Sequence, residues 1–155
     1  MDPVADLMLA AANSAPLSLL VRYEGVLVPQ RPEGPSAPDV ALLSLLRRVT
    51  KRPHTTLHLI TAASAAGAAG WFDGTGVTVH AADGHPLAMP ALLATVRAVQ
   101  PEAQCVVIGT TSVDEDLFLL VRAPDVTARV GSGATAAEAR LEDTDTVRGL
   151  LGALC

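Results

Sequence analysis

Charged and hydroxyl side chains follow two apolar runs of this sequence. The first run ends at Arg22, and Glu24 comes two residues later; the second ends at Gly109 and is followed by Thr110 and Thr111. An arginine is always cationic and is not a nucleophile, whereas a carboxylate can serve as a general acid or base. Arginine, threonine hydroxyls and the backbone amides of a turn can also bind phosphate or carboxylate groups. These residue types therefore allow two uses, an internal ion pair or a site for a small anion.

Arg22 stands at the end of a segment, LSLLVRY at residues 17–23, that has the length and composition of a central strand buried on both faces. A buried charge without a partner is very costly, so an arginine that points inward must be paired. We expect its guanidinium to pair with Asp114 or Glu24. The alternative is that Arg22 turns outward to solvent.

Strands and helices alternate along the sequence. Apolar and β-branched runs predict strands at residues 17–23, 56–61, 75–80, 104–108 and 126–130. Helical spacing and composition predict helices at residues 4–13, 40–52, 62–69, 91–99, 114–121 and 145–153. Asp39 and the Asp143/Asp145 pair stand where helix N-caps belong. The alternation predicts an α/β fold, with a mainly parallel sheet covered on both faces, in a single domain over residues 1–155.

The charge, the cysteine content and the apolar runs of the chain exclude several classes of protein. The chain has 155 residues, a formal net charge of −5 and 17% charged residues, without the basic stripe of a nucleic-acid-binding protein. Two cysteines, Cys105 and Cys155, do not make a disulfide framework. The N-terminus lacks the positive region of a signal peptide, and no apolar run approaches the roughly 20 residues of a membrane span. We therefore expect a cytoplasmic protein without a membrane span and without nucleic acid as a partner.

Four segments, in order along the chain, carry a family resemblance. They are residues 21–28 (VRYEGVLV), 71–73 (WFD), 106–118 (VVIGTTSVDEDLF) and 130–137 (VGSGATAA). The first is similar to the Asp-Tyr-Asp-Gly-Thr-Leu signature of trehalose-phosphate phosphatases, a branch of the haloacid dehalogenase (HAD) superfamily. The third resembles that family's Gly-Asp-Asp-x-Thr-Asp-Glu-Asp-x-Phe motif, and the last its C-terminal ending. The resemblance implies a Rossmann-like, HAD-type three-layer α/β/α sandwich.

The resemblance also implies that the catalytic groups have been replaced. Arg22 matches the aspartate that attacks phosphorus and binds magnesium in the family, and Glu24 matches the aspartate that acts as general acid and base. Thr110 and Thr111 match the paired aspartates that serve magnesium, while Asp114 is retained. A hard cation needs several oxygen ligands with a surplus of negative charge, so we expect no metal and no cofactor here.

Two further parts of the family's machinery have no counterpart in this sequence. Thr61 matches the family's phosphate-binding hydroxyl, but the family's lysine would fall near Ala88-Met89, and the only lysine of the chain is Lys51. The cap domain that reads the sugar would insert around residues 81–89, a span far too short for a domain. We therefore expect a HAD-like core domain without a cap.

These departures lead to two alternative functions. The first is a catalytically inactive pseudophosphatase that acts as a protein-interaction, scaffold or regulatory subunit, with a protein partner or a second copy of itself. Its motivation is the absent chemistry and absent cap, combined with 50% apolar residues in a small domain. The second is a sensor of phosphate or sugar phosphate, in which Arg22, Thr61, Thr110 and Thr111 line the degenerate pocket. Residual hydrolysis through Glu24 and Asp114 is a third, weaker alternative.

Overall fold

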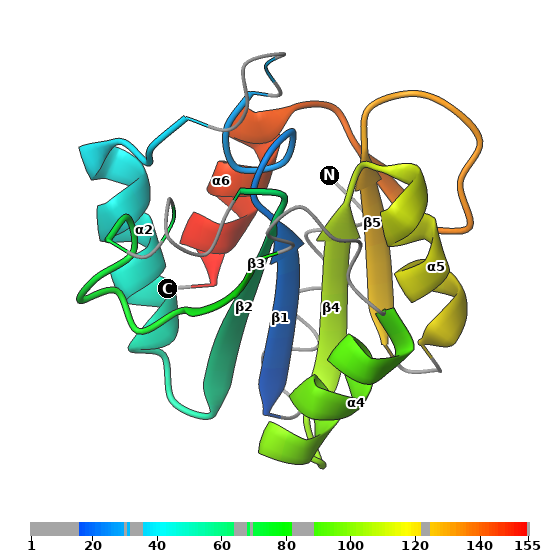
Figure 1. Ribbon diagram of the computed structural model, residues 1–155, viewed down its shortest axis with the longest axis horizontal. Helices are drawn as coiled ribbons and strands as arrows, with labels where there is room; N and C mark the ends of the chain where they lie inside the picture. Colours follow the sequence, from blue (N-terminus) through cyan, green and yellow to red (C-terminus); the bar gives the residue numbers. More distant parts are fainter. Residues whose placement is uncertain are drawn as a thin grey trace.

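One parallel β-sheet forms the centre of the structure (Figure 1). The computed structural model describes residues 16–29, 31, 36–63, 68, 70–81, 89–121 and 125–154. Within these ranges the sheet has six strands in the order β3-β2-β1-β4-β5-β6, and all neighbouring strands are parallel. The strands are β1 (Leu17–Arg22), β2 (Thr55–Thr61), β3 (Thr78–Ala81), β4 (Gln104–Gly109), β5 (Val126–Val130) and β6 (Ala139–Leu141).

Helices cover both faces of the sheet. Helices α2 (Val40–Thr50) and α6 (Thr144–Ala153) pack on one face, and α4 (Met89–Val99) and α5 (Ser112–Leu120) pack on the other. Each pair of helices contributes to its own apolar cluster with the sheet. The predicted α/β/α sandwich with a mainly parallel sheet is therefore confirmed. No helix within the described ranges has both the length and the apolar character needed to cross a membrane.

Strand β1 lies in the interior of the sheet and has apolar side chains on each of its two faces. All six of its residues are buried. Successive side chains of a strand point to opposite faces, so Leu17, Leu19 and Val21 join the cluster under α2 and α6, whereas Leu20 joins the cluster under α4 and α5. Arg22 ends this strand on the same face as Leu20. The strand therefore ends with the cationic side chain of Arg22 at the carboxyl edge of the sheet.

The N-caps of three helices match their sequence signals. Asp39 caps α2 by accepting a hydrogen bond from the amide of Leu42 at 2.7 Å. Asp143 caps α6 and accepts from the amide of Thr146 at 2.8 Å. Helix α5 begins with Thr111 as N-cap in a full capping box, so it starts at Ser112, two residues before the predicted boundary.

Other boundaries differ from expectation for local reasons. Strand β3 begins at Thr78 rather than residue 75, because Thr75 closes a turn onto the carbonyl of Phe72 and Gly76 has a φ of 84°. Strand β6 was not predicted, since it has three residues and only Leu141 is buried. Some sequence predictions concern residues outside the described ranges. They are the helix at 4–13, most of the helix at 62–69, residues 82–88, where the family's cap would insert, and Cys155.

Candidate functional site

Three neighbouring strands deliver the predicted site residues to one edge of the sheet. Arg22 is the last residue of β1, Thr61 is the last residue of β2, and Gly109 ends β4. These strands are parallel and adjacent, so their carboxyl ends lie together, which is where open α/β sheets commonly place their ligands. The first turn of α5, which follows β4 at once, brings Asp114 over the same edge.

The guanidinium of Arg22 pairs with two carboxylates. Its Nη2 lies 2.8 Å from Oδ1 of Asp114, and its Nε lies 3.3 Å and 3.2 Å from Oδ1 and Oδ2 of that residue. Its Nη1 lies 3.5 Å from Oε1 of Glu24. The three residues are buried, with exposed fractions of 7% for Arg22, 2% for Glu24 and 1% for Asp114. The prediction that Arg22 points inward and pairs is confirmed, and it pairs with both acids rather than with one.

The carboxylate of Glu24 is also held from strand β2. The hydroxyl of Thr61 donates to Oε2 at 2.7 Å, and the amide of Ala62 donates to Oε1 at 2.7 Å. The Thr61 hydroxyl in turn accepts from the amide of Ala63 at 3.1 Å. The Thr61 hydroxyl therefore already donates its hydrogen bond to a carboxylate of the protein itself.

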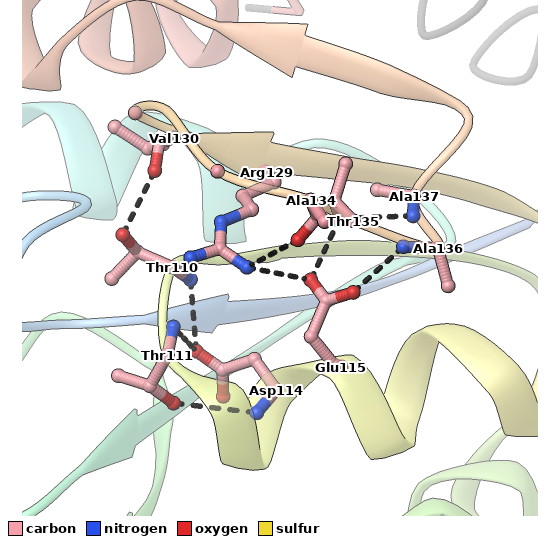
Figure 2. A network of polar contacts seen from close by, with 12 residues as sticks. Thr110, Thr111, Asp114, Glu115, Arg129, Val130, Ala134, Thr135, Ala136 and Ala137 are labelled. Atoms are coloured by element: carbon pink, nitrogen blue, oxygen red, sulfur yellow. Dashed lines mark hydrogen bonds and ion pairs between the residues drawn. The ribbon is translucent and has the colours of Figure 1, made fainter.

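The carboxylate of Asp114 is held from the turn after β4 (Figure 2). The amides of Thr110 and Thr111 donate to its Oδ2 at 2.9 Å and 3.0 Å, and its own amide donates to the Thr111 hydroxyl at 3.3 Å. The hydroxyl of Thr110 turns away and donates to the carbonyl of Val130 at 2.8 Å. A Cβ on Gly109 would lie 2.5 Å from the Cβ of Asp114, so this close approach requires glycine.

The two neighbouring acids keep Arg22 cationic in spite of its burial. Burial opposes the charge of Arg22, but the hydrogen bonds and charge of Asp114, together with Glu24, outweigh it and raise the pKa of Arg22 above its ordinary value. All four carboxylate oxygens accept hydrogen bonds from the chain itself. Groups of the protein itself thus supply hydrogen bonds to every carboxylate oxygen of the site.

Magnesium, which the family resemblance implies, does not fit these residues. A hard divalent ion needs several free oxygen ligands and an excess of negative charge. Here a permanent cation lies between the two carboxylates, and each carboxylate oxygen is already engaged by an internal donor. Among the described residues, no group of three or more His, Cys, Asp or Glu side chains could hold a metal ion.

Beside this site, Glu115 anchors the loop after β5 (Figure 2). Its Oε2 accepts from the Thr135 hydroxyl at 2.7 Å and from Nη1 of Arg129 at 3.1 Å, and its Oε1 accepts from the amide of Ala136 at 2.6 Å. Arg129 also donates to the carbonyl of Ala134 at 3.1 Å. Although burial opposes it, these bonds lower the pKa of Glu115. Sequence reasoning placed Glu115 in a helix but did not detect this role, and no local pattern indicates a partner 20 residues away.

Replacing Glu115 by alanine is expected to release residues 134–136 from α5. Several charge-assisted hydrogen bonds end on this one side chain, so we expect a loss of about 1–2 kcal/mol in the free energy of unfolding. Urea denaturation measures the loss, and hydrogen exchange at the Ala136 amide locates it. The matched control is Asp116→Ala, at the neighbouring exposed position, which should change stability by less than about 0.5 kcal/mol. Equal effects of both variants would contradict the anchoring role.

Solved phosphatase and hydrolase structures have the same fold. Aspergillus fumigatus trehalose-6-phosphate phosphatase (crystal form 2) superimposes with a TM-score of 0.79 at 13% identity, over 99% of this chain and 98% of that chain. A putative HAD family hydrolase from Streptomyces avermitilis gives a TM-score of 0.69 at 16% identity, over 94% of this chain and 96% of that one.

A third structure is 3-deoxy-D-manno-octulosonate 8-phosphate phosphatase from Moraxella catarrhalis, with a TM-score of 0.63 at 19% identity, over 94% of this chain and 88% of that chain. No protein-family profile matches this chain, and no curated protein sequence matches it. At these identities the likeness establishes the fold. The chain has the HAD fold in a form like that of trehalose-phosphate phosphatases.

Proposed function

We propose that this protein is a catalytically inactive member of the HAD-fold proteins, a pseudophosphatase, that acts through protein contacts as an interaction, scaffold or regulatory subunit. One observation carries the proposal. The tip of β1, where the family resemblance places the attacking carboxylate, holds Arg22, and its guanidinium is bonded to both acids that remain there.

The family reaction lacks its first step in such a site. A guanidinium has no electron pair to offer to phosphorus at any ordinary pH. Glu24 and Asp114 are the two acids that could substitute, but both are buried and bonded to Arg22. An attack by either carboxylate would require breaking its bonds to Arg22 and to the other internal donors that hold it, which is strongly unfavourable for buried groups.

Absence of phosphatase activity is the expected result of the most direct test. The purified protein would be incubated with magnesium and an aryl phosphate, and separately with sugar phosphates, and release of inorganic phosphate would be measured. We expect no product above the protein-free blank. Phosphate release that disappears in both Glu24→Gln and Asp114→Asn would contradict the proposal, because a contaminating phosphatase would not respond to those substitutions.

Contact formation is tested by association in solution. Light scattering over a concentration series, combined with cross-linking, should show self-association or a defined complex with a protein from the source cells. A strict monomer at high concentration, with no partner recovered from the native extract, would count against an interaction role.

Small-anion binding is the second candidate, and one observation favours it. Nε and Nη2 of Arg22 and the amides of Thr110 and Thr111 converge on one oxyanion group, the carboxylate of Asp114. The same contacts make binding costly, since an incoming phosphate must displace a buried carboxylate. The interaction role is therefore the primary proposal.

A thermal-shift titration distinguishes the two candidates. A ligand at 100 times its dissociation constant would stabilise the protein by about 2.7 kcal/mol. A second readout is available because Trp71, the only tryptophan, packs with a ring-centroid distance of 5.9 Å on Tyr23, which stands between Arg22 and Glu24 in the sequence. Flat melting curves and unchanged Trp71 fluorescence with inorganic phosphate and sugar phosphates would exclude the sensor role.

A further inference from the structure

Two histidines on neighbouring strands form a partly buried hydrogen bond that involves none of the residues of the Arg22 site. Nδ1 of His58 on β2 lies 3.0 Å from Nε2 of His80 on β3. Their ring centroids are 5.3 Å apart and the ring planes are inclined by 25°. His58 is 2% exposed, and its other nitrogen, Nε2, is buried without a hydrogen-bond partner among the residues that the structure describes. The bond therefore links the short edge strand β3 to the interior of the sheet.

The unpartnered nitrogen selects the tautomer of the pair. A neutral imidazole has one N–H donor and one bare acceptor nitrogen. If His80 donated, His58 would keep an N–H at Nε2 with no acceptor in the described part of the chain. If His58 donates from Nδ1, its Nε2 carries only a lone pair, which is the less costly of the two unsatisfied groups. The neutral pair is thus held as His58 Nδ1–H bonded to His80 Nε2.

Among the described residues, few charged side chains could affect the protonation of His58 and His80. His58 shares its face of the sheet with Ile60 of β2 and Leu20 of β1, both apolar. The charged side chain of α4, Arg97, pairs with Asp125 at 2.8 Å. On α5, Asp114 pairs with Arg22 and Glu115 with Arg129, while Asp116 is exposed. Burial lowers the pKa of His58 to about 4, with the charge of His80 adding to the effect, and burial also lowers the pKa of His80.

Two protonation steps remove the hydrogen bond. The first proton binds His80 at Nε2, and His58 must move its own proton from Nδ1 to the buried Nε2. The hydrogen bond is then reversed, with His80 as donor, and the new N–H at Nε2 of His58 has no acceptor among the described residues. The second proton returns to Nδ1 of His58, and two N–H groups on two cations then face each other. Each step is unfavourable in the folded strand pair and easy when β3 is free in water.

We propose that the His58–His80 hydrogen bond is an acid-sensitive latch that fixes the edge strand β3 to β2, and that its protonation releases β3 while the central strands stay folded. The latch adjoins the Arg22 site. His80 is paired in register with Ile60, and the next pair is Ala81 with Thr61, the residue that donates to Glu24. Release of β3 therefore loosens the strand end that holds Glu24.

The direction of the pH dependence follows from linkage. The folded pair resists protonation, so the released state binds more protons below the ordinary histidine pKa of about 6.5. The latch is fully stabilising above that pH and weakens as the pH falls toward about 4, the pKa of His58. Two pH units below the ordinary value, one linked proton favours release by up to about 100-fold.

Hydrogen exchange resolved by residue tests this proposal on the full chain. Protection factors, which correct for the pH dependence of intrinsic exchange, would be compared for β3 and β4 between pH 7 and pH 4.5. We expect β3 to lose about 10- to 100-fold in protection relative to β4 in the wild type. In His58→Leu/His80→Thr the ratio should not change with pH. In His80→Asn, whose carbonyl still accepts from His58, the loss should be smaller than in wild type.

Several results would overturn the latch. Parallel loss of protection in β3 and β4 would indicate global unfolding instead. An undiminished pH effect in both variants would assign it to other groups. Binding of zinc at pH 7, seen as a shift of the imidazole nitrogen resonances on addition of the metal alone, would replace the latch by a metal site. His54→Asn, at an exposed position outside the pair, is the control and should keep the wild-type behaviour.

Discussion

Replacing Arg22 by methionine is expected to lower the free energy of unfolding by about 3–5 kcal/mol at neutral pH. Methionine retains much of the side-chain volume, so the effect reports the lost charge rather than a cavity. Without the guanidinium, two carboxylates with exposed side-chain fractions of 3% and 1% lie buried side by side. Like charges in a site of low dielectric repel strongly, and neither acid can move to solvent without breaking its bonds to the backbone.

Urea denaturation of four variants, Arg22→Met, Asp114→Asn, the double variant and a control, measures this effect. The matched control, Arg48→Met, makes the same chemical change on the exposed face of α2 and should alter stability by less than about 0.5 kcal/mol. The double variant Arg22→Met/Asp114→Asn removes one of the two stranded carboxylates and their mutual repulsion, so its loss should fall about 2 kcal/mol short of the sum of the single losses. Additive losses, or a loss near that of Arg48→Met, would show that the ion pair does not stabilise the fold.

The second large effect is expected from Gly109→Ala. The added Cβ would lie 2.5 Å from Cβ and 2.7 Å from Cγ and Oδ2 of Asp114. The obstacle is the base of a capping side chain rather than a flexible end, so the first turn of α5 must shift. We expect a loss of about 1–3 kcal/mol, as for an overpacked core, with most of the coupling between Arg22 and Asp114 lost as well.

Gly149→Ala is the control for this substitution. Gly149 lies in α6, is exposed, and its added Cβ would meet no atom within 4 Å. The same methyl group should there stabilise the protein by up to about 1 kcal/mol through helix propensity. The two variants therefore have opposite expected signs. Stabilisation or neutrality of Gly109→Ala would show that Asp114 does not occupy the position over β4 described above.

The interior strands could be predicted from the sequence because burial on both faces leaves a continuous apolar run. Residues 17–22, 104–109 and 126–130 form strands within one residue of the predicted limits. Edge strands carry a weaker signal, since one side of the strand meets solvent or turn residues. This explains both the late start of β3 and the missed β6.

The pairing of Arg22 could be predicted from the sequence because a buried cation without an anionic partner is very unfavourable. Asp114 and Glu24 were identified as candidate partners through the family resemblance, which places both acids in the same pocket as Arg22. Other contacts depend on register, which the sequence does not state. His58 meets His80 because β2 and β3 align His58 with Thr78, and Glu115 meets Thr135 because the loop after β5 folds back over α5.

Residues that correspond to catalytic positions in the family thus have structural roles in this chain. Arg22, Thr61, Thr110 and Thr111 all direct donors toward internal acceptors. The prediction that they bind a ligand stays a prediction, and the thermal-shift titration tests it. The stability measurements on Arg22 and Gly109 address a separate point, the contribution of the trio to folding, and would hold whether or not a partner is found.

The two outermost strands of the sheet are short, with four residues in β3 and three in β6. Short edge strands have few unpaired backbone groups to which another chain could add a strand, so they disfavour polymerisation. Strand β2 is longer, with seven residues including Leu57, Leu59 and Ile60, and β3 covers its outer side. A protein stripped of β3 in acid would therefore expose β2 as a template for fibril growth.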